Sequence, residues 1–465
     1  MAYTRRNTTD GVTIMNKDLY DNLQDGIEER GITPEMFGAK GDGVTDDSDA
    51  LNEAFNVSDK VILGPGKIYR IKNGLRVYRE NFYLIGNNST ILVDSLFNPS
   101  SDDRFGVIRL ESTNKHFVGE GVTLKITSSY SRPESYTMYG LYMLPQKTKS
   151  VSLKKFNIIF DELELPQSTS RHCMTFTGSN LIIEQCNFWN KAKSVAGGCL
   201  WIDSDEDFCI VNIKNSEFIN FASDEVFASY GSGEKHIFIS GSYFVHNTEY
   251  LKKNTIMMAF YKGENFVSFD SSLIEQYGLN DSFKLATLIR GGDEEGKEVS
   301  VSFVGCIIRS KLNSGIFTTT NRKPLGNFHI HATDCYIENT LGPIIGSWSP
   351  YEEGIGNALP ATYCILDQCK LKSLYAIAEG SNNTLDIYKV ILNNCIAYIE
   401  QAKRGFYCYY NNTMMLEVIN SFIDTDTEVS LVYTRSAPIS GTSPFYKSFV
   451  DIKNSFLNGE LIVTN

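Results

Sequence analysis

The sequence predicts an all-β fold, a right-handed parallel β-helix of about 10–12 coils with a short N-terminal helical segment and a capping helix. The first observation is a phrase that occurs ten times, in which an apolar pair, a polar turn, a Cys or Ser and a second apolar pair follow one another. The second is another strand, rich in β-branched and aromatic residues, about fifteen residues before each phrase. Two or three short strands per repeat, bounded by Gly, Asn and Ser, are typical of one coil of a parallel β-helix.

The Cys or Ser of each phrase marks the length of a coil. These markers are Cys186, Ser216, Ser242, Ser272, Cys306, Cys335, Cys369, Cys395, Ser421 and Ser455. Their spacing varies from 26 to 34 residues, which is too irregular for a solenoid of helix pairs. The repeat therefore favours one long domain over residues 32–465 instead of several shorter ones.

Small marker side chains at equivalent positions are expected to stack inside the rod as a ladder. A buried thiol packs as a small apolar group, so the marker cysteines are predicted to be reduced core residues. No CxxC pair occurs in the chain, which argues against a zinc site.

Charge and hydrophobicity argue against two classes of partner. The chain has 43 Lys and Arg against 55 Asp and Glu, a net charge of −12, and no basic block, so a nucleic-acid partner is not expected. No run of about 18 apolar residues occurs, and the first residues lack the apolar core of a signal peptide. We therefore expect a protein that is made in a cytoplasm and does not insert into a membrane.

Residues 32–75 predict the start of the rod. The stretch FGAKGDGVTDD is a Gly-rich turn whose Asp46 can cap a short helix. The apolar face of that helix consists of Ala50, Leu51, Ala54 and Phe55. A helix at this point can cover the open strand edges at the end of the rod.

This segment resembles the N-terminal signature of the pectate-lyase-like superfamily, which is found in many phage tail spikes and in polygalacturonase-related enzymes. The matching residues are Phe37, Gly38, Ala39, Gly41, Asp42, Gly43, Asp46, Asp47, Ala50 and Leu51. The resemblance implies a β-helix, in agreement with the repeat, and a structural role for these glycines and aspartates. It does not imply a phosphate or metal site at GDG.

Residues 1–31 resemble the leading segments of phage tail fibres and receptor-binding appendages. Met15, Leu19, Leu23 and Ile27 recur at four-residue steps, which indicates an amphipathic helix. We interpret the segment as a virion-attachment or trimerisation element, the alternative being an extra cap helix. The resemblance implies a homotrimer in the virion, made in the host cytoplasm and attached to a tail or appendage structural protein.

The densest acidic cluster, WIDSDED, contains Asp203 and Asp205 and is followed one coil later by SDEVFASYGS, which contains Asp224 and Glu225. The 26-residue offset between the markers 216 and 242 predicts that Trp201 lies beside Phe227 and Asp203 beside Ser229. The two acidic groups are then expected to approach each other on neighbouring coils.

The second stretch is similar to the central coils of bacterial pectate lyases, where aspartates on adjacent coils hold calcium and an arginine acts as the base. The resemblance implies calcium binding at Asp224 and no other cofactor. Ala228 stands where some members have an acidic residue. Arg290 and Lys262, predicted to share one strand column with that stretch, are the candidates for the positive group of a lyase.

A glycoside hydrolase needs two carboxylates instead, roughly 5–5.5 Å apart for retention and 6.5–9.5 Å for inversion. Asp203, Asp205, Asp224 and Glu225 can provide that pair, so lyase and hydrolase both remain open.

Three further residues are candidates for contact with a sugar. Trp201 and Tyr230 fall at strand ends, where flat aromatic faces can pack against sugar rings. His172 lies just before the acidic cluster, although a lone histidine is more often structural.

These residues predict a tail spike that binds and depolymerises a bacterial surface glycan, namely capsule, exopolysaccharide or wall teichoic acid. The alternative is a receptor-binding tail protein without enzymatic activity on the same scaffold, because a fold does not dictate an activity.

Overall fold

A computed structural model describes the chain from residue 31 onward, so the predicted leading segment lies outside the described residues except for its last one. The described ranges are 31–95, 97, 104–127, 137–144, 148–161, 170–192, 197–222, 225–247, 255–277, 286–291, 297–311, 315–320, 327–345, 358–360, 363–374, 376–379, 387–400, 406–408, 413–425, 432–434, 449–457 and 460–462.

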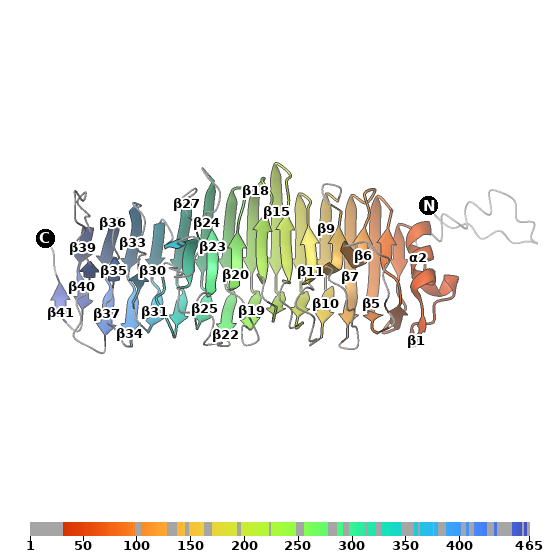
Figure 1. Cartoon of the computed structure of the whole chain (residues 1–465), viewed down its shortest axis with the longest axis horizontal. Coiled ribbons are helices and arrows are strands. Elements are labelled where there is room, and N and C mark those ends of the chain that lie inside the picture. Colours follow the sequence, from red (N-terminus) through yellow and green to blue (C-terminus); the bar gives the residue numbers. More distant parts are fainter. Residues whose placement is uncertain are drawn as a thin grey trace, which may run out of the picture.

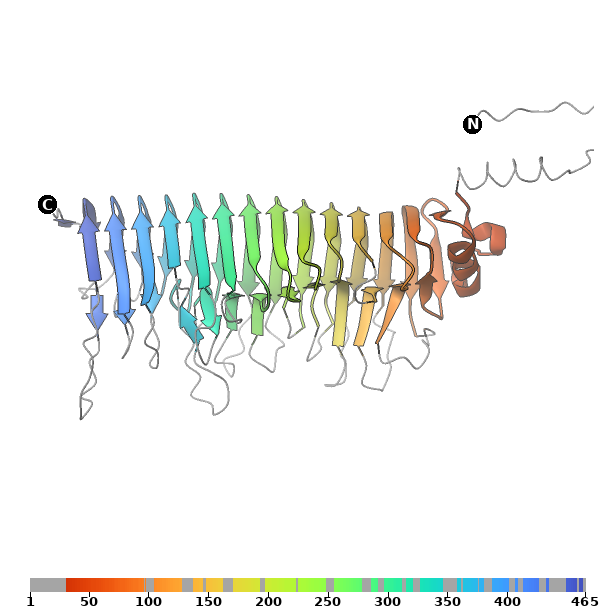
Figure 2. The ribbon, with the colours of Figure 1, turned by 90° about the horizontal axis from the view of Figure 1, so that it is seen from above.

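The protein is a rod of stacked coils, and the colours follow the sequence from one end of the rod to the other (Figures 1 and 2). A representative coil consists of β14 (Leu200–Asp203), β15 (Phe208–Lys214) and β16 (Glu217–Asn220), after which β17 (Phe227–Tyr230) begins the next coil. Each strand pairs in parallel with its equivalents in the coils before and after it. The predicted parallel β-helix is therefore confirmed.

The first strands of the coils form a ten-stranded sheet that carries the candidate site. Its other members are β4 (Leu75–Val77), β6 (Arg104–Leu110), β8 (Thr137–Met143), β11 (Ser170–Phe176), β20 (Thr255–Phe260), β23 (Ala286–Gly291), β26 (Phe317–Thr320) and the antiparallel β29 (Ala358–Pro360). Farther along the rod, a three-stranded sheet consists of β32 (Ala378–Glu379), β35 (Phe406–Cys408) and β38 (Val432–Thr434).

The other strands belong to a 28-stranded sheet that folds around the rod in two columns. One column contains β2 (Lys60–Ile62), β5 (Asn81–Val93), β7 (His116–Ile126), β9 (Ser150–Lys154), β12 (Asn180–Glu184), β15, β18 (Glu234–Ser240), β21 (Asn265–Asp270), β24 (Glu298–Val304), β27 (Asn327–Thr333), β30 (Tyr363–Asp367), β33 (Ile387–Asn393), β36 (Thr413–Ile419) and β39 (Phe449–Lys453).

The second column contains β1 (Asp42–Asp46), β3 (Ile68–Ile71), β10 (Asn157–Phe160), β13 (Asn187–Asn190), β16, β19 (Tyr243–Asn247), β22 (Leu273–Tyr277), β25 (Ile307–Ser310), β28 (Tyr336–Asn339), β31 (Lys370–Ser373), β34 (Ile396–Ile399), β37 (Phe422–Thr425), β40 (Ser455–Leu457) and the antiparallel β41 (Glu460–Ile462).

The predicted Cys and Ser ladder lies at the corner between these two columns. The residue before each marker has a left-handed backbone, as at Asn215 (φ 49°), which turns the chain sharply and points the marker inward. The Cys186 N–H donates to Ser216 Oγ at 3.1 Å, and the Ser216 N–H donates to Ser242 Oγ at 3.2 Å. The markers therefore satisfy buried main-chain donors from one coil to the next. The nine cysteines whose side chains the structure describes are buried and free of disulfides, which confirms the prediction for the five marker cysteines.

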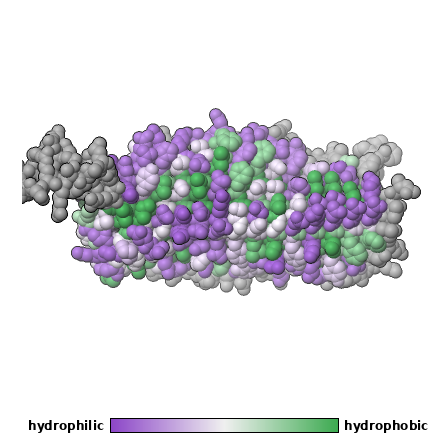
Figure 3. All heavy atoms as spheres, turned by 180° about the vertical axis from the view of Figure 1, so that it is seen from behind, coloured by the Kyte–Doolittle hydropathy of each residue, from purple (hydrophilic) through white to green (hydrophobic). Residues whose placement is uncertain are grey.

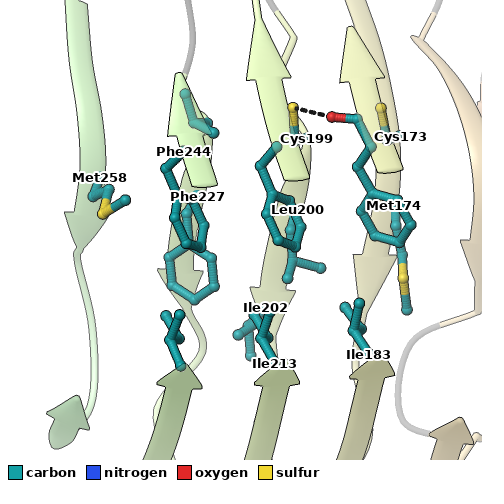
Figure 4. Close-up of a cluster of buried hydrophobic side chains, with 14 of the residues drawn as sticks. Cys173, Met174, Ile183, Cys199, Leu200, Ile202, Ile213, Phe227, Phe244 and Met258 are labelled. Atoms are coloured by element: carbon teal, nitrogen blue, oxygen red, sulfur yellow. Dashed lines mark hydrogen bonds between the residues drawn. The ribbon is translucent and has the colours of Figure 1, made fainter. Parts of the chain in front are cut away.

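The core fills the inside of every coil. Figure 4 shows side chains such as Leu200, Ile202, Ile213 and Phe227 pointing into this space from facing strands, with Cys199 Sγ donating to the Phe188 carbonyl at 3.2 Å. Each buried side chain of this size stabilises the fold by about 1.5–3 kcal/mol.

The cap is a 3₁₀ turn, η1 (Pro34–Phe37), followed by helix α2 (Ser48–Val57). Phe55 of α2 is buried, and its ring lies 4.9 Å from the ring of Phe82, so the predicted apolar face covers the end of the rod. The helix N-cap is Asp47, not Asp46 as predicted. Asp46 Oδ1 instead accepts from Ser48 Oγ at 2.6 Å, and the carboxylate of Asp47 closes the Gly-rich turn by accepting the N–H groups of residues 40 and 41.

No helix in the described part of the chain is long and apolar enough to cross a membrane.

Candidate functional site

The register of the ten-stranded sheet decides which side chains share its outer face. Trp201 pairs with Ala228, and Asp203 pairs with Tyr230, so the predicted pairings with Phe227 and Ser229 were wrong by one residue. The turn 204–207 is one residue longer than the turn 231–233 that stacks on it, because Asp203 pairs with Tyr230 whereas Phe208 pairs with Glu234. A shift of one residue turns every side chain to the other face.

Six ring side chains form a continuous row on the outer face of this sheet, which we call the aromatic column. It consists of Tyr142, Tyr139, His172, Trp201, Tyr230 and Tyr261. Successive ring centroids are 4.8, 5.2, 3.9, 5.4 and 4.7 Å apart. The column crosses β8, β11, β14, β17 and β20, so it follows the long axis of the rod.

His172 is the buried centre of the aromatic column. Its Nδ1 accepts the Gly198 N–H at 3.2 Å, which places the proton of the neutral ring on Nε2, 2.6 Å from Ser170 Oγ. Burial, with a smaller contribution from the charge of Arg171, lowers the pKa of His172 to about 3. His172 is 1% exposed and hydrogen-bonded within the protein, so it supports the rings beside it, and its contact with a sugar stays a prediction.

Trp201, Tyr230 and Tyr261 are only partly buried, so their rings are the ones that a ligand can reach. Tyr261 was not selected from the sequence. The backbone of Tyr261 lies level with Tyr230 in the neighbouring coil. Its hydroxyl nevertheless donates to Oε1 of Glu225, which precedes Tyr230 by five residues. The Tyr261 ring must therefore lean back over the small Ala228 and Ala259, which pair beneath it. The signal in the sequence was the repeated pattern of Ala followed two residues later by Tyr at 228–230 and 259–261.

The acidic turn, residues 204–207, follows β14 and lies on one side of the aromatic column. Asp203, just before it, and Asp205 are exposed. Asp205 Oδ1 accepts the N–H of Ser232 at 2.9 Å and its hydroxyl at 3.2 Å. Glu206 forms an ion pair with Lys149 at 2.5 Å. Asp205 thus connects two neighbouring coils and still presents a carboxylate to solvent.

Glu225 lies at the other end of the same strands. Its backbone is beside Gly198, and its side chain is 7% exposed against the Tyr261 hydroxyl. The structure therefore places Asp203 and Asp205 at the carboxyl end of β14 and Glu225 at the amino end of β17, with the aromatic rings between them. The predicted approach of the two acidic groups was wrong for these three residues, because they lie at opposite ends of paired strands. Asp224 lies outside the described residues.

Of the two candidate cations, only Arg290 lies on a strand of the predicted column. Arg290 pairs with Ala259 and so continues the register of Trp201 and Ala228, whereas Lys262 lies in the turn beyond β20. Lys262 is exposed, and its main-chain carbonyl accepts from Asn265 Nδ2 at 3.0 Å. The structure describes the backbone of Arg290 only.

No group of three or more His, Cys, Asp or Glu side chains that could hold a metal ion occurs among the residues whose placement is described. The calcium site implied at Asp224 stays a prediction.

The outer face thus combines accessible aromatic rings, which pack against sugar faces, with carboxylates, which accept hydrogen bonds from hydroxyl groups. Over 187 residues the chain is 40% identical to a capsule K30/K69-specific depolymerase of Klebsiella phage K64-1. This similarity, like the parallel β-helix itself, agrees with the resemblance to phage tail proteins that the sequence indicated.

The match covers 37% of this chain and 22% of the depolymerase, so the chain spans under a quarter of the length of that relative. No protein-family model matches the sequence.

Two solved structures are also similar. Tailspike protein 3 of bacteriophage CBA120 is 12% identical, with a TM-score of 0.45 over 96% of this chain and 65% of that one. The A-module of a mannuronan C-5 epimerase from Azotobacter vinelandii is 13% identical, with a TM-score of 0.37 over 92% of this chain and 99% of that one. Similarity at these scores has no bearing on the activity.

Proposed function

We propose that this protein is a phage tail spike that binds a bacterial surface polysaccharide along the aromatic column and depolymerises it. The observation that carries the proposal is the row of accessible rings at Trp201, Tyr230 and Tyr261, with carboxylates on both of its sides. The relative described as a capsule depolymerase supports the same substrate class.

A glycan chain is proposed to lie along the rod axis over these three rings. Strands in a sheet are about 4.8 Å apart, so the accessible rings on β14, β17 and the end of β20 extend over roughly 10 Å. A surface of this length suits more than one sugar ring. Asp203 and Asp205 are positioned to accept hydrogen bonds from hydroxyl groups along one side of the bound segment.

The depolymerising step is proposed to use the chain's own carboxylates or cations. In a hydrolase, the carboxylate pair is proposed to come from one edge of the strands, either Glu225 with Asp224 or Asp203 with Asp205, because the two edges are five residues, roughly 16 Å, apart. Glu225 is nearly buried beside a tyrosine hydroxyl, which suits a general acid. In a lyase, Arg290, which shares the register of Trp201, or Lys262 is the base, and Asp224 is the residue through which calcium would hold an acidic sugar.

The functional form is proposed to be a homotrimer in the virion, held by a tail structural protein. Figure 3 shows apolar patches on an otherwise hydrophilic face of the rod. Ile307, Ile396, Phe422 and Phe456 are exposed in one register column of the 28-stranded sheet. Apolar side chains in such a row favour association with another protein surface.

Light scattering of the wild-type chain and of F422D tests the trimer. A wild-type monomer would contradict it.

The decisive experiment incubates the purified chain with capsular, exopolysaccharide and teichoic-acid preparations and follows glycan size by chromatography and unsaturated ends by ultraviolet absorbance. We expect at least one glycan to shorten. If the glycan shortens and absorbance appears, and R290A or K262A abolishes both, the protein is a lyase. If the glycan shortens without new absorbance, and E225Q or D205N abolishes the shortening, the protein is a hydrolase. W189A, which alters a ring on the other sheet, is the matched control.

If cells are bound and no glycan shortens, the enzymatic proposal fails and the receptor-binding alternative replaces it. If neither binding nor shortening occurs, the aromatic column is not a glycan site.

A further inference from the structure

Beneath the aromatic column the interior of the rod carries polar residues where other coils are apolar. Lys235 and Asn265, both fully buried, point inward at one register position on β18 and β21. The same position is Cys209 in the preceding coil and Val299 in the following one. The polar positions thus coincide with the coils of Tyr230 and Tyr261, whose rings lie on the outer face.

The Lys235 ammonium binds main-chain carbonyls from the turns of two coils. Its Nζ donates to Gly231 O at 2.8 Å, to Gly233 O at 2.9 Å and to Lys262 O at 3.4 Å. Asn265 repeats the arrangement one coil later, because its Nδ2 donates to Lys262 O at 3.0 Å and to Gly263 O at 3.1 Å. These two side chains therefore organise the turns that follow Tyr230 and Tyr261 from the inside.

The same turn is held from the outside by the acidic turn. Ser232 donates twice to Asp205, as described above. Gly231 and Gly233 pack so closely on residues 204 and 206 that a Cβ at either glycine would overlap a main-chain carbonyl oxygen. The turn 231–233 consequently lies between the Lys235 ammonium inside and the Asp205 carboxylate outside, with little freedom to shift.

The fold itself does not require a charge at this position. A buried ammonium is costly unless several acceptors replace its water, and a small or apolar residue fills the same register in both flanking regions. Departures from an apolar interior concentrate where function demands a fixed geometry. The charge at Lys235 is thus explained by the turn 231–233, which its ammonium holds in place.

We infer that Lys235 is a positioning residue for the glycan-binding face. Its ammonium fixes the turn 231–233 and thereby the spacing between the Asp205 carboxylate, the Tyr230 ring before the turn and Lys262 on the next coil. Lys235 does not contact the glycan. This inference rests on the proposed function of the aromatic column.

The test compares wild type with K235M, which keeps the length of the side chain and removes the ammonium. K372M is the charge-matched control, since Lys372 pairs with Glu338 and Glu400 on the other side of the coil. Hydrogen exchange of the Ser232 amide is measured without glycan, and glycan affinity is measured per folded molecule. K235M should raise the exchange rate and weaken binding, each about tenfold or more, while K372M changes neither.

K235C is the second variant, because cysteine occupies the same register one coil earlier, and it applies if K235M does not fold. K235R restores a cationic donor and should recover part of the affinity. Unchanged exchange and affinity in folded K235M or K235C, or an equal loss in K372M, overturns the inference. Absence of glycan binding by the wild-type chain refutes the proposed function instead, and the two failures are thereby distinguished.

Discussion

Replacing Ser242 by alanine should lower the free energy of unfolding, because one buried main-chain N–H group loses its acceptor. Ser242 is 2% exposed in the interior ladder, and its Oγ accepts the Ser216 N–H at 3.2 Å. Alanine leaves that buried N–H without its acceptor. The carbonyl of Ser240, to which the Ser242 hydroxyl donates, still accepts the Asn215 N–H at 3.0 Å. The loss is therefore one unsatisfied donor, with a cost of roughly 1–3 kcal/mol.

The matched control is S242C. Cysteine occupies the equivalent position in other coils, where Cys335 Sγ accepts the Cys306 N–H at 3.4 Å. Sulfur is a weaker acceptor than a hydroxyl oxygen, but it still accepts this hydrogen bond. S242C should therefore lower the free energy of unfolding by less than half as much as S242A does.

Denaturant titration followed by circular dichroism measures both variants, with the change in midpoint interpreted at an unchanged slope. Wild-type stability in S242A, or an equal loss in S242C and S242A, would refute the role of the ladder as a chain of hydrogen-bond acceptors.

Four further predictions concern the candidate site. W201A should lower glycan affinity about tenfold, while W189A leaves it unchanged, as measured by calorimetry. Y261F should destabilise the fold by roughly 1–3 kcal/mol, since the buried Glu225 loses its donor, and wild-type stability would show that the hydrogen bond is not needed. The pKa of His172 is lowered to about 3 in the folded protein. Between about pH 6.5 and 3 the unfolded chain therefore binds a proton that the folded chain does not, so the free energy of unfolding should decrease as the pH is lowered through this window. H172F should flatten that dependence in denaturation curves, and an unchanged slope would contradict the buried neutral state. D224N should abolish any calcium dependence of binding, and a dependence that survives in D224N excludes this residue as the ligand.

The coil repeat could be predicted from the sequence because its physical cause is local. Each marker follows a left-handed turn residue and fills a small interior space, so the same residue types recur at Cys186, Ser216 and Ser242 whatever lies between them. The buried face of the cap helix was predictable for a similar reason, since the periodicity of a single helix shows it.

The composition of the candidate site was only partly predictable. Trp201 and Tyr230 were selected because they fall at strand ends, where flat aromatic faces can pack against sugar rings. Tyr261 was missed, and the role of Lys235 was missed, because each depends on a neighbour from another coil. Arg290 lies in the strand column that the sequence indicated, but the positions of Glu225, His172 and Arg290 relative to one another follow from the register of the strands.

The sequence by itself determined the parallel β-helix, its ladder and its cap, because these follow from periodic patterns within short segments. Only the tertiary structure decided which residues share the outer face. The turn 204–207 is one residue longer than the turn 231–233, and that single residue moves Trp201 from Phe227 to Ala228 and Asp203 from Ser229 to Tyr230. A marker-to-marker count includes every turn in the coil and cannot reveal which turn holds the extra residue. The side-chain period of a strand is two, so an error of one in that count exchanges the inside and the outside of the rod.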